Sequence, residues 1–96
     1  MRGEDAIRQN LLLDHPRPKY PSNALLYRLT GKGIFELSFD YETGQLREIH
    51  IVKSTGHRSL DASIIDALRK WRAKPHGLRV ISVPIAFEIS GEPSPK

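Results

Sequence analysis

Apolar and polar residues alternate with a period of two in three stretches of the chain, which predicts three strands with one buried face each. In residues 33–41 the apolar positions are Phe35, Leu37, Phe39 and Tyr41. In residues 79–89 they are Ile81, Val83, Ile85, Phe87 and Ile89. Residues 46–53 form the third stretch, with Ile49 and Ile51 inward and Leu46 out of phase, which predicts a bulge near Arg47.

A longer spacing marks the helices. Residues 59–70 are predicted to form the main helix. Its apolar stripe, at helical spacing, consists of Leu60, Ile64, Ile65, Leu68 and Trp71, the residue just after the helix. Shorter helices are predicted over residues 5–13 and from Ser22, as N-cap, to Leu29. In the turn between the first two strands, we expect Gly44 to adopt a positive φ.

The order of these elements predicts an α+β fold. The first two strands form an antiparallel hairpin, and the helix that follows brings the third strand back beside the first. The result is a three-stranded antiparallel sheet of order 2-1-3, numbered along the chain. The main helix packs on one face of this sheet, and a short N-terminal helix precedes it. The last strand is then an edge.

Pro84 lies in the middle of that last strand. Because proline has no amide hydrogen, it must face the side of the strand that has no ladder. Backbone groups alternate along a strand, so we expect four other residues to face the same side: Val80, Ser82, Ala86 and Glu88. Pro84 either protects this edge from aggregation or leaves it open to an added peptide strand. The pattern alone favours protection.

Composition and charge narrow the class of protein. The chain has 96 residues, of which 39% are hydrophobic and 27% charged, and this fits one small globular domain. It contains no cysteine, no secretory signal at its start, and no apolar run near the ~20 residues that span a bilayer. We therefore expect that the chain as given neither inserts into a membrane nor exports itself.

Basic residues exceed acidic ones, 15 to 11, for a net charge of +4. Much of the excess lies in one stretch: Arg69, Lys70, Arg72, Lys74 and Arg79. Such a patch can bind nucleic acid or an anionic surface. The favoured interpretation is that cations gather near the C-terminus of a helix, where the carbonyl groups carry partial negative charge.

Candidate catalytic and metal-binding residues are sparse. The four histidines, His15, His50, His57 and His76, lack metal-ligand spacing. Ser54-Thr55-Gly56 sits where amides can bind an anion, but it lacks the longer glycine-rich loop and lysine of a nucleotide site. No serine, histidine and carboxylate group into a triad. We expect no catalytic residue, no metal and no cofactor.

Five motifs in order resemble the C-terminal domain of the TonB energy-transducer family. They are PKYPSNAL (18–25), GIFELSFDY (33–41), KSTGHRSLD (53–61), ALRKWRAKP (67–75) and VPIAF (83–87). The resemblance implies a periplasmic domain that adds the TonB box, a short extended segment of an outer-membrane transporter, to its last strand. It also implies coupling of the inner-membrane proton-motive force, through motor proteins, to active uptake such as that of siderophores.

By position, the resemblance implies a gripping strand at residues 80–89, with Val80, Ser82, Pro84, Ala86 and Glu88 facing the peptide. A second contact is implied at Arg17, Pro18, Lys19 and Tyr20. We expect the domain at residues 15–90, an N-terminal extension with a short helix at 1–14 and a flexible tail at 91–96.

Some positions depart from the family pattern. Ala73 stands where an aromatic residue is frequent, and Arg17 stands where the best-known members carry a glutamine. The motor-binding helix and the long linker are absent from the given sequence, so we expect that this chain cannot transduce energy alone and is inner-membrane anchored only in a longer form.

The sequence therefore predicts a non-enzymatic adaptor in the periplasm. With the resemblance included, addition of a partner strand is favoured over simple protection of the edge. Two alternatives stay open: a basic surface that binds peptidoglycan or nucleic acid, and self-pairing of the domain into a homodimer.

Overall fold

The computed structural model describes residues 2–89. The helices and strands have these bounds: α1 Gly3–Arg8, β1 Leu12–Asp14, α2 Ser22–Leu26, β2 Gly31–Phe39, β3 Leu46–Lys53, α3 Arg58–Leu68, β4 Arg72–Ala73 and β5 Val80–Phe87. Residue 90, the last of the predicted domain, and the tail predicted over residues 91–96 lie outside the described residues.

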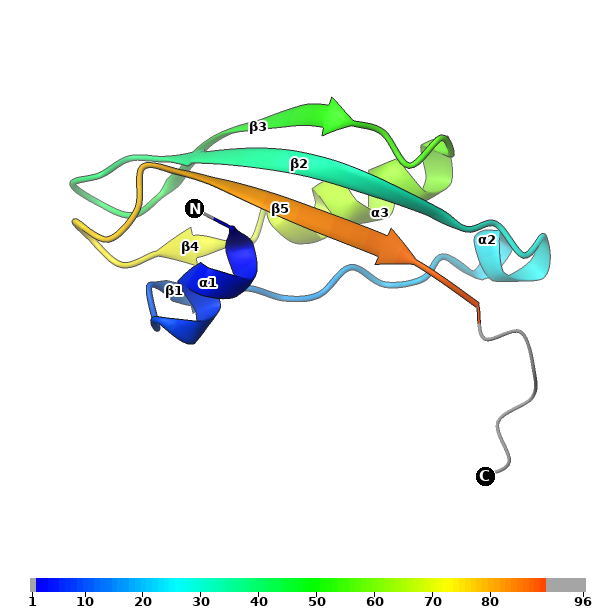
Figure 1. Cartoon of the computed structure of the whole chain (residues 1–96), viewed down its shortest axis with the longest axis horizontal. Coiled ribbons are helices and arrows are strands. Elements are labelled where there is room, and N and C mark those ends of the chain that lie inside the picture. The colour runs from blue at the N-terminus through cyan, green and yellow to red at the C-terminus, as the bar shows by residue number, and fades with distance from the viewer. Residues whose placement is uncertain (1, 90–96) are drawn as a thin grey trace, which may run out of the picture.

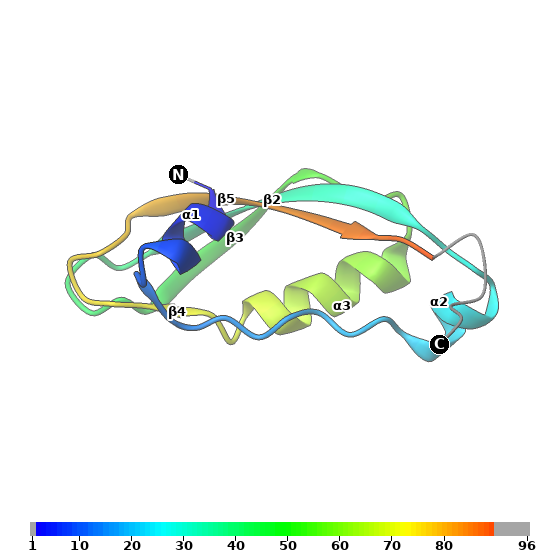
Figure 2. The same cartoon turned by 60° about the horizontal axis from the view of Figure 1, so that its bottom comes forward.

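Strands β3, β2 and β5 form one antiparallel sheet in that order (Figure 1). This confirms the predicted α+β fold and the 2-1-3 order, with β5 at an edge. Helix α3 and the extended segment 15–21 form a second layer beneath one face of the sheet, as Figure 2 shows. Three fully buried residues of α3 complete the core against Phe35, Leu37 and Ile81: Leu60, Ile64 and Leu68.

Strand β3 pairs with β2 irregularly at two points. Ser38 pairs with Glu48 but Phe39 pairs with Leu46, so Arg47 is the extra residue of a bulge, as predicted. A second shift leaves Val52 without a partner in β2. Bulges of this kind twist an edge strand away from flat pairing.

The turn between β2 and β3 packs against Ala73 in β4. Gly44 has a φ of +81°, which confirms the prediction, and a Cβ there would lie 2.0 Å from the carbonyl oxygen of Ala73. The Ala73 amide donates to the Gly44 carbonyl over 2.9 Å. Asp40 closes the turn, because its Oδ1 accepts from the amide of Glu42 at 2.9 Å.

The N-terminal elements differ from their predicted form. The helix expected over residues 5–13 ends at Arg8, since Asn10 adopts a φ of +60° and the chain then forms β1. Strand β1 pairs with β4 through Leu12 and Ala73 in a small second sheet that the sequence did not predict. Residues 2–14, the predicted extension, thus pack against the rest of the molecule.

The helix expected over residues 22–29 is shorter than predicted. α2 ends at Leu26, and Arg28 has a φ of +55°, which helical residues do not adopt. Its N-cap is Pro21, with no side-chain capping bond, so the predicted role of Ser22 as N-cap is wrong.

The loop before α3 is organised by Asp61. Its Oδ1 accepts from the Thr55 amide at 3.0 Å and from the Thr55 hydroxyl at 2.6 Å, and its Oδ2 accepts from the Ser54 hydroxyl. Partial burial opposes ionisation, but the hydrogen bonds from Ser54 and Thr55 outweigh it and hold the pKa of Asp61 below its ordinary value. Ser54-Thr55-Gly56 is therefore a structural turn, as its short loop suggested.

We expect Gly44→Ala to destabilise the domain by more than about 1 kcal/mol, since it adds a clash to an unfavourable φ. Gly56→Ala is the matched control: its φ is +93°, but a Cβ there meets nothing within 4 Å. Urea unfolding should rank Gly44→Ala as clearly the less stable variant. Equal losses would contradict the close approach of this turn to Ala73.

A depressed folded-state pKa means that Asp61 contributes stability above its unfolded pKa, which is about 3.9, and loses it as the pH falls through the lower folded value. Stability of the native chain should therefore decline with acid in this window. Asp61→Asn should be less stable at pH 7 and flatter below about pH 4. Asp66→Asn, at an exposed carboxylate of the same helix, is the control and should keep the native profile.

Candidate functional site

The outer edge of β5 presents every second backbone unit away from the sheet. The Phe39 amide donates to the Arg79 carbonyl over 2.8 Å, which fixes the odd-numbered residues of this stretch as those bonded to β2. Pro84 lies opposite Ile34 and faces away, consistent with its missing amide hydrogen. The residues that share its direction are those expected from the sequence: Val80, Ser82, Ala86 and Glu88.

This edge is occupied at one end by the chain itself. Arg2 forms an isolated parallel bridge with Ser82, so the expectation of an edge open along its whole length is wrong at this point. Figures 1 and 2 both show α1 beside the first half of β5. In the described part of the chain, no strand pairs with β5 beyond Ser82 on this side.

Two hollows border the second half of β5, one on each face of the sheet. The outer hollow, of about 400 Å³, is lined by Lys32, Gly33, Ile34, Lys53, Pro84, Ile85, Ala86 and Glu88. The inner hollow, of about 260 Å³, is lined by Gly3, Glu4, Ile7, His15, Arg17, Pro18, Trp71, Val83, Pro84 and Ile85. Because Pro84 and Ile85 line both, the unpaired backbone runs along the rim between them.

The extended segment 15–21 is held beneath the sheet by side chains of the helical layer. The indole Nε1 of Trp71 donates to the Pro16 carbonyl over 2.9 Å, and the Ser63 hydroxyl donates to the Lys19 carbonyl. The tryptophan expected in the helical stripe is buried, 6% exposed, although α3 ends before it.

The four predicted residues of this segment are placed differently from one another. Arg17 and Pro18 line the inner hollow together with Pro84. Lys19 is exposed and lines another cavity, over α3 with Lys70. Tyr20 packs its ring 4.8 Å from that of Phe87 and donates its hydroxyl to the Leu29 carbonyl. The structure thus brings two of the four residues to the edge of β5 and ties Tyr20 to the end of that strand.

The docked position of α1 was not expected from the sequence. Gly3, Glu4 and Ile7 line the inner hollow, and Ala6 is fully buried. The small residues Gly3 and Ala6, three positions apart on one face of the helix, are the only sequence signal for such close packing.

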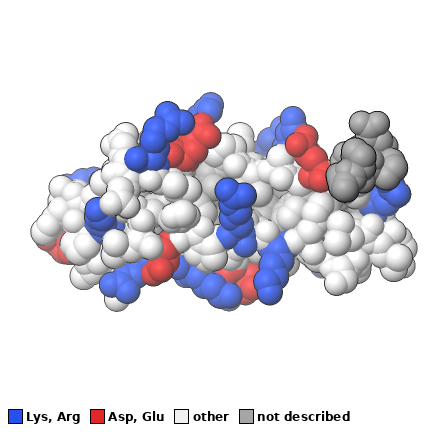
Figure 3. Space-filling model, turned by 90° about the horizontal axis from the view of Figure 1, so that it is seen from below, with Lys and Arg blue, Asp and Glu red and all other residues white. Residues whose placement is uncertain are grey.

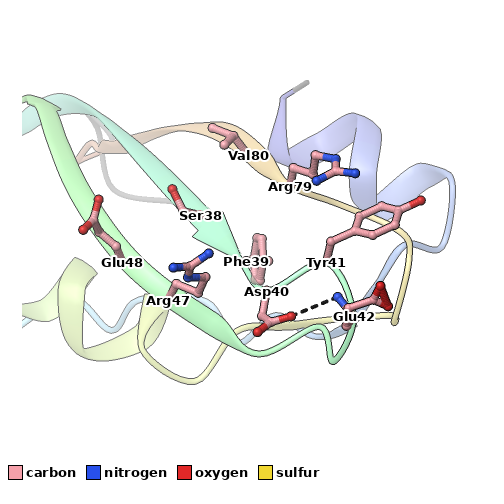
Figure 4. A pocket seen from close by; sticks show the side chains of 9 residues that line it. All are labelled: Ser38, Phe39, Asp40, Tyr41, Glu42, Arg47, Glu48, Arg79 and Val80. Atoms are coloured by element: carbon pink, nitrogen blue, oxygen red, sulfur yellow. Dashed lines mark hydrogen bonds between the residues drawn. The ribbon is translucent and has the colours of Figure 1, made fainter.

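Another hollow, of about 670 Å³, lies at the opposite end of β5, around the hairpin turn (Figure 4). It carries charges of both signs, and several have structural roles. Asp40 is engaged in the turn, and the Arg79 guanidinium lies 4.1 Å from the centroid of the Tyr41 ring. Val80 lines this hollow, whereas Pro84, Ala86 and Glu88 line the outer hollow at the other end of the edge.

Charges of both signs are mixed on the face that Figure 3 shows. Lys and Arg side chains stand there in separate groups, several with Asp or Glu side chains beside them. Within residues 2–89, no three His, Cys, Asp or Glu side chains group as metal ligands, and no helix is long and apolar enough to cross a membrane.

Comparison with known proteins gives the family. The model for the Gram-negative bacterial TonB protein C-terminal region matches residues 16–90. The chain belongs to the TonB C-terminal domain family. This confirms the resemblance stated above. The proteins of this family are non-enzymatic and couple transport, which confirms the prediction that the chain is not an enzyme.

One curated relative and one solved structure support the assignment. Protein TonB of Vibrio cholerae is 29% identical over 96 aligned positions, which include 86% of this chain and 39% of that protein. The chain therefore spans well under half the length of this relative. The solution structure of the Pseudomonas aeruginosa TonB C-terminal domain shares the fold, with a TM-score of 0.63, 22% identity, and coverage of 86% of this chain and 87% of that one.

The position of residues 15–18 beneath the sheet should depend on the hydrogen bond from the Trp71 indole to the Pro16 carbonyl. Trp71→Phe keeps a ring in the core but removes the donor to Pro16, and it should cost about 1 kcal/mol of unfolding free energy. Tryptic cleavage after Lys19, the residue that follows this segment, should accelerate as well. Tyr27→Phe, at a residue 72% exposed, is the control and should change neither quantity. An unchanged cleavage rate in Trp71→Phe would contradict this anchoring role.

Proposed function

We propose that this TonB-type domain captures the TonB box of an outer-membrane transporter in the periplasm by adding it as a strand to the outer edge of β5. In an inner-membrane-anchored full-length protein, this capture couples the proton-motive force, through motor proteins, to active uptake. Membership of the TonB C-terminal family supports the proposal.

The observation that carries the proposal is the unpaired edge that runs from Pro84 in β5 to Glu88 just after it, set between the two hollows. Ala86 offers both an amide and a carbonyl to an added strand, and Pro84 offers its carbonyl. Side chains of an added strand alternate between faces, so successive ones point toward the outer and the inner hollow. Arg17 and Pro18 line the inner one and are proposed contacts.

The binding free energy shows how much the two hollows must contribute. Three backbone hydrogen bonds to Pro84 and Ala86 give about 3 kcal/mol net, since each contributes about 0.5–1.5 kcal/mol. Micromolar affinity needs about 8.2 kcal/mol. Burial of apolar side chains, at about 25 cal/mol per Å² before ordering costs, must supply the rest. Capture is therefore weak and reversible, as a coupler that must release its partner requires.

The alternative of a basic surface for peptidoglycan or nucleic acid is less well supported. On the face that Figure 3 shows, the basic side chains stand in separate groups and do not form a continuous cationic surface for an anionic polymer. Self-pairing would use the same edge of β5 and therefore compete with peptide binding.

Replacing the outward amide tests the proposal. Ala86→Pro removes the N–H that an added strand would bond, without touching the ladder to β2, and Pro84 shows that the strand accepts proline. It should weaken binding of a synthetic TonB-box peptide about threefold to tenfold, whereas Ala86→Ser keeps the amide and should bind normally. Calorimetric titration measures both affinities.

Amide signals supply the second readout. In the native chain the peptide should shift Ala86 and Glu88. Shifts confined to α3, or equal affinity of Ala86→Pro and Ala86→Ser, would overturn strand addition. Binding that falls steeply with salt and survives Ala86→Pro would select the basic surface, and a concentration-dependent sedimentation coefficient would select self-pairing.

A further inference from the structure

The N-terminal segment uses the same backbone edge that a partner strand would use. Ser82 faces outward on β5 and is bridged by Arg2. Its amide and carbonyl on that side cannot bond to the backbone segment around Arg2 and to an added peptide strand at the same time. Occupation of Ser82 by the two is therefore mutually exclusive.

Close packing fixes α1 at this position. A Cβ on Gly3 would lie 3.1 Å from Val83 Cγ2 and 3.7 Å from Trp71 Cζ3, so the helix backbone touches the inner side of β5. Ala6, one turn later, is fully buried. This contact is adjacent to the unpaired stretch that begins at Pro84.

The same helix is poorly stabilised by itself. It has six residues and no side-chain hydrogen bond at its N-cap. Isolated helices shorter than about 12–15 residues are marginal in water, so α1 persists through its contact with β5 and Trp71. An element held in this way can be displaced without unfolding the sheet.

We propose that α1 determines the length and register of the strand that β5 accepts, an inference that rests on the proposed function. With α1 docked, the edge is open from Pro84 to Glu88, a stretch that pairs with about five residues at about 3.3 Å each. A partner that continues to Ser82 and Val80 must displace Arg2 and α1. The N-terminal segment is thus a selectivity element that limits capture to short extended segments.

A disulfide lock tests this directly, because the native chain has no cysteine. The double variant R2C/S82C places a cysteine at each of the two bridged positions. Bridged backbone segments lie about 4.7–4.9 Å apart, inside the range of about 4.4–6.8 Å between Cα atoms that a disulfide spans. The oxidised form holds α1 in place, and the reduced form leaves it free to undock. The same protein thus supplies its own control.

The probes are three synthetic peptides: a five-residue TonB-box segment, and the same segment extended by four residues at its N-terminus or at its C-terminus. With the reduced protein, one extended peptide should bind about threefold to tenfold more tightly than the five-residue peptide, because it gains backbone hydrogen bonds at Ser82. With the oxidised protein, all three peptides should bind equally.

A second pair of variants tests the same role of α1 without relying on disulfide formation. Ala6→Lys places a charge in the buried contact of α1, and Gln9→Lys adds the same charge at an exposed position after the helix. If α1 is undocked about 10% of the time in the native chain, a variant that undocks it fully should bind the extended peptide about tenfold more tightly. Gln9→Lys should have no effect, and thermal melts confirm that both variants fold.

The outcomes separate the role of α1 from strand addition itself. An extended peptide that keeps its advantage in the oxidised lock, or no advantage of extension even in Ala6→Lys, overturns the role of α1 and leaves strand addition standing. If none of the three peptides binds any form, the edge is not a binding site and both proposals fall.

Discussion

A proline inside an antiparallel strand can pair on one side only, and this constraint at Pro84 organises the functional surface. Its missing amide hydrogen fixes which backbone groups of β5 bond to β2 and which face solvent. The odd-numbered residues are committed to the sheet and place Ile81, Val83 and Phe87 in the core. The even-numbered residues face away from β2, and Arg2 bridges one of them, Ser82. Core and recognition edge are thus two sides of one strand.

The helical layer determines how much of that edge is usable. Trp71 holds the extended segment 15–18 under β5 through the Pro16 carbonyl, and this places Arg17 and Pro18 beside Pro84. On the other flank, Arg2 bridges Ser82, and Gly3 of α1 packs against Val83 and Trp71. A single buried tryptophan therefore contacts both elements that frame the unpaired stretch. Stability of the core and geometry of the edge are linked through it.

The sheet could be predicted from sequence because its signals are local and repeated. Alternation in residues 33–41 and 79–89 gave the strands, the out-of-phase Leu46 gave the bulge at Arg47, and the crossover helix gave the order. The pairing of β1 with β4 could not be predicted, since strands of three and two residues carry no periodicity and form only where the fold brings Leu12 to Ala73. The docking of α1 depends in the same way on tertiary packing, and the positive φ of Arg28 that ends α2 has no sequence signature.

Hydrogen exchange of the β5 amides, measured in the free domain and again with a bound TonB-box peptide, is the most direct test. The amides of Ile85 and Phe87 should exchange slowly in both states, because they bond to β2. The amide of Ala86 should exchange rapidly in the free domain and slowly in the complex. Slow exchange of Ala86 in the free domain, or no change on binding, would contradict an open edge that receives the partner strand.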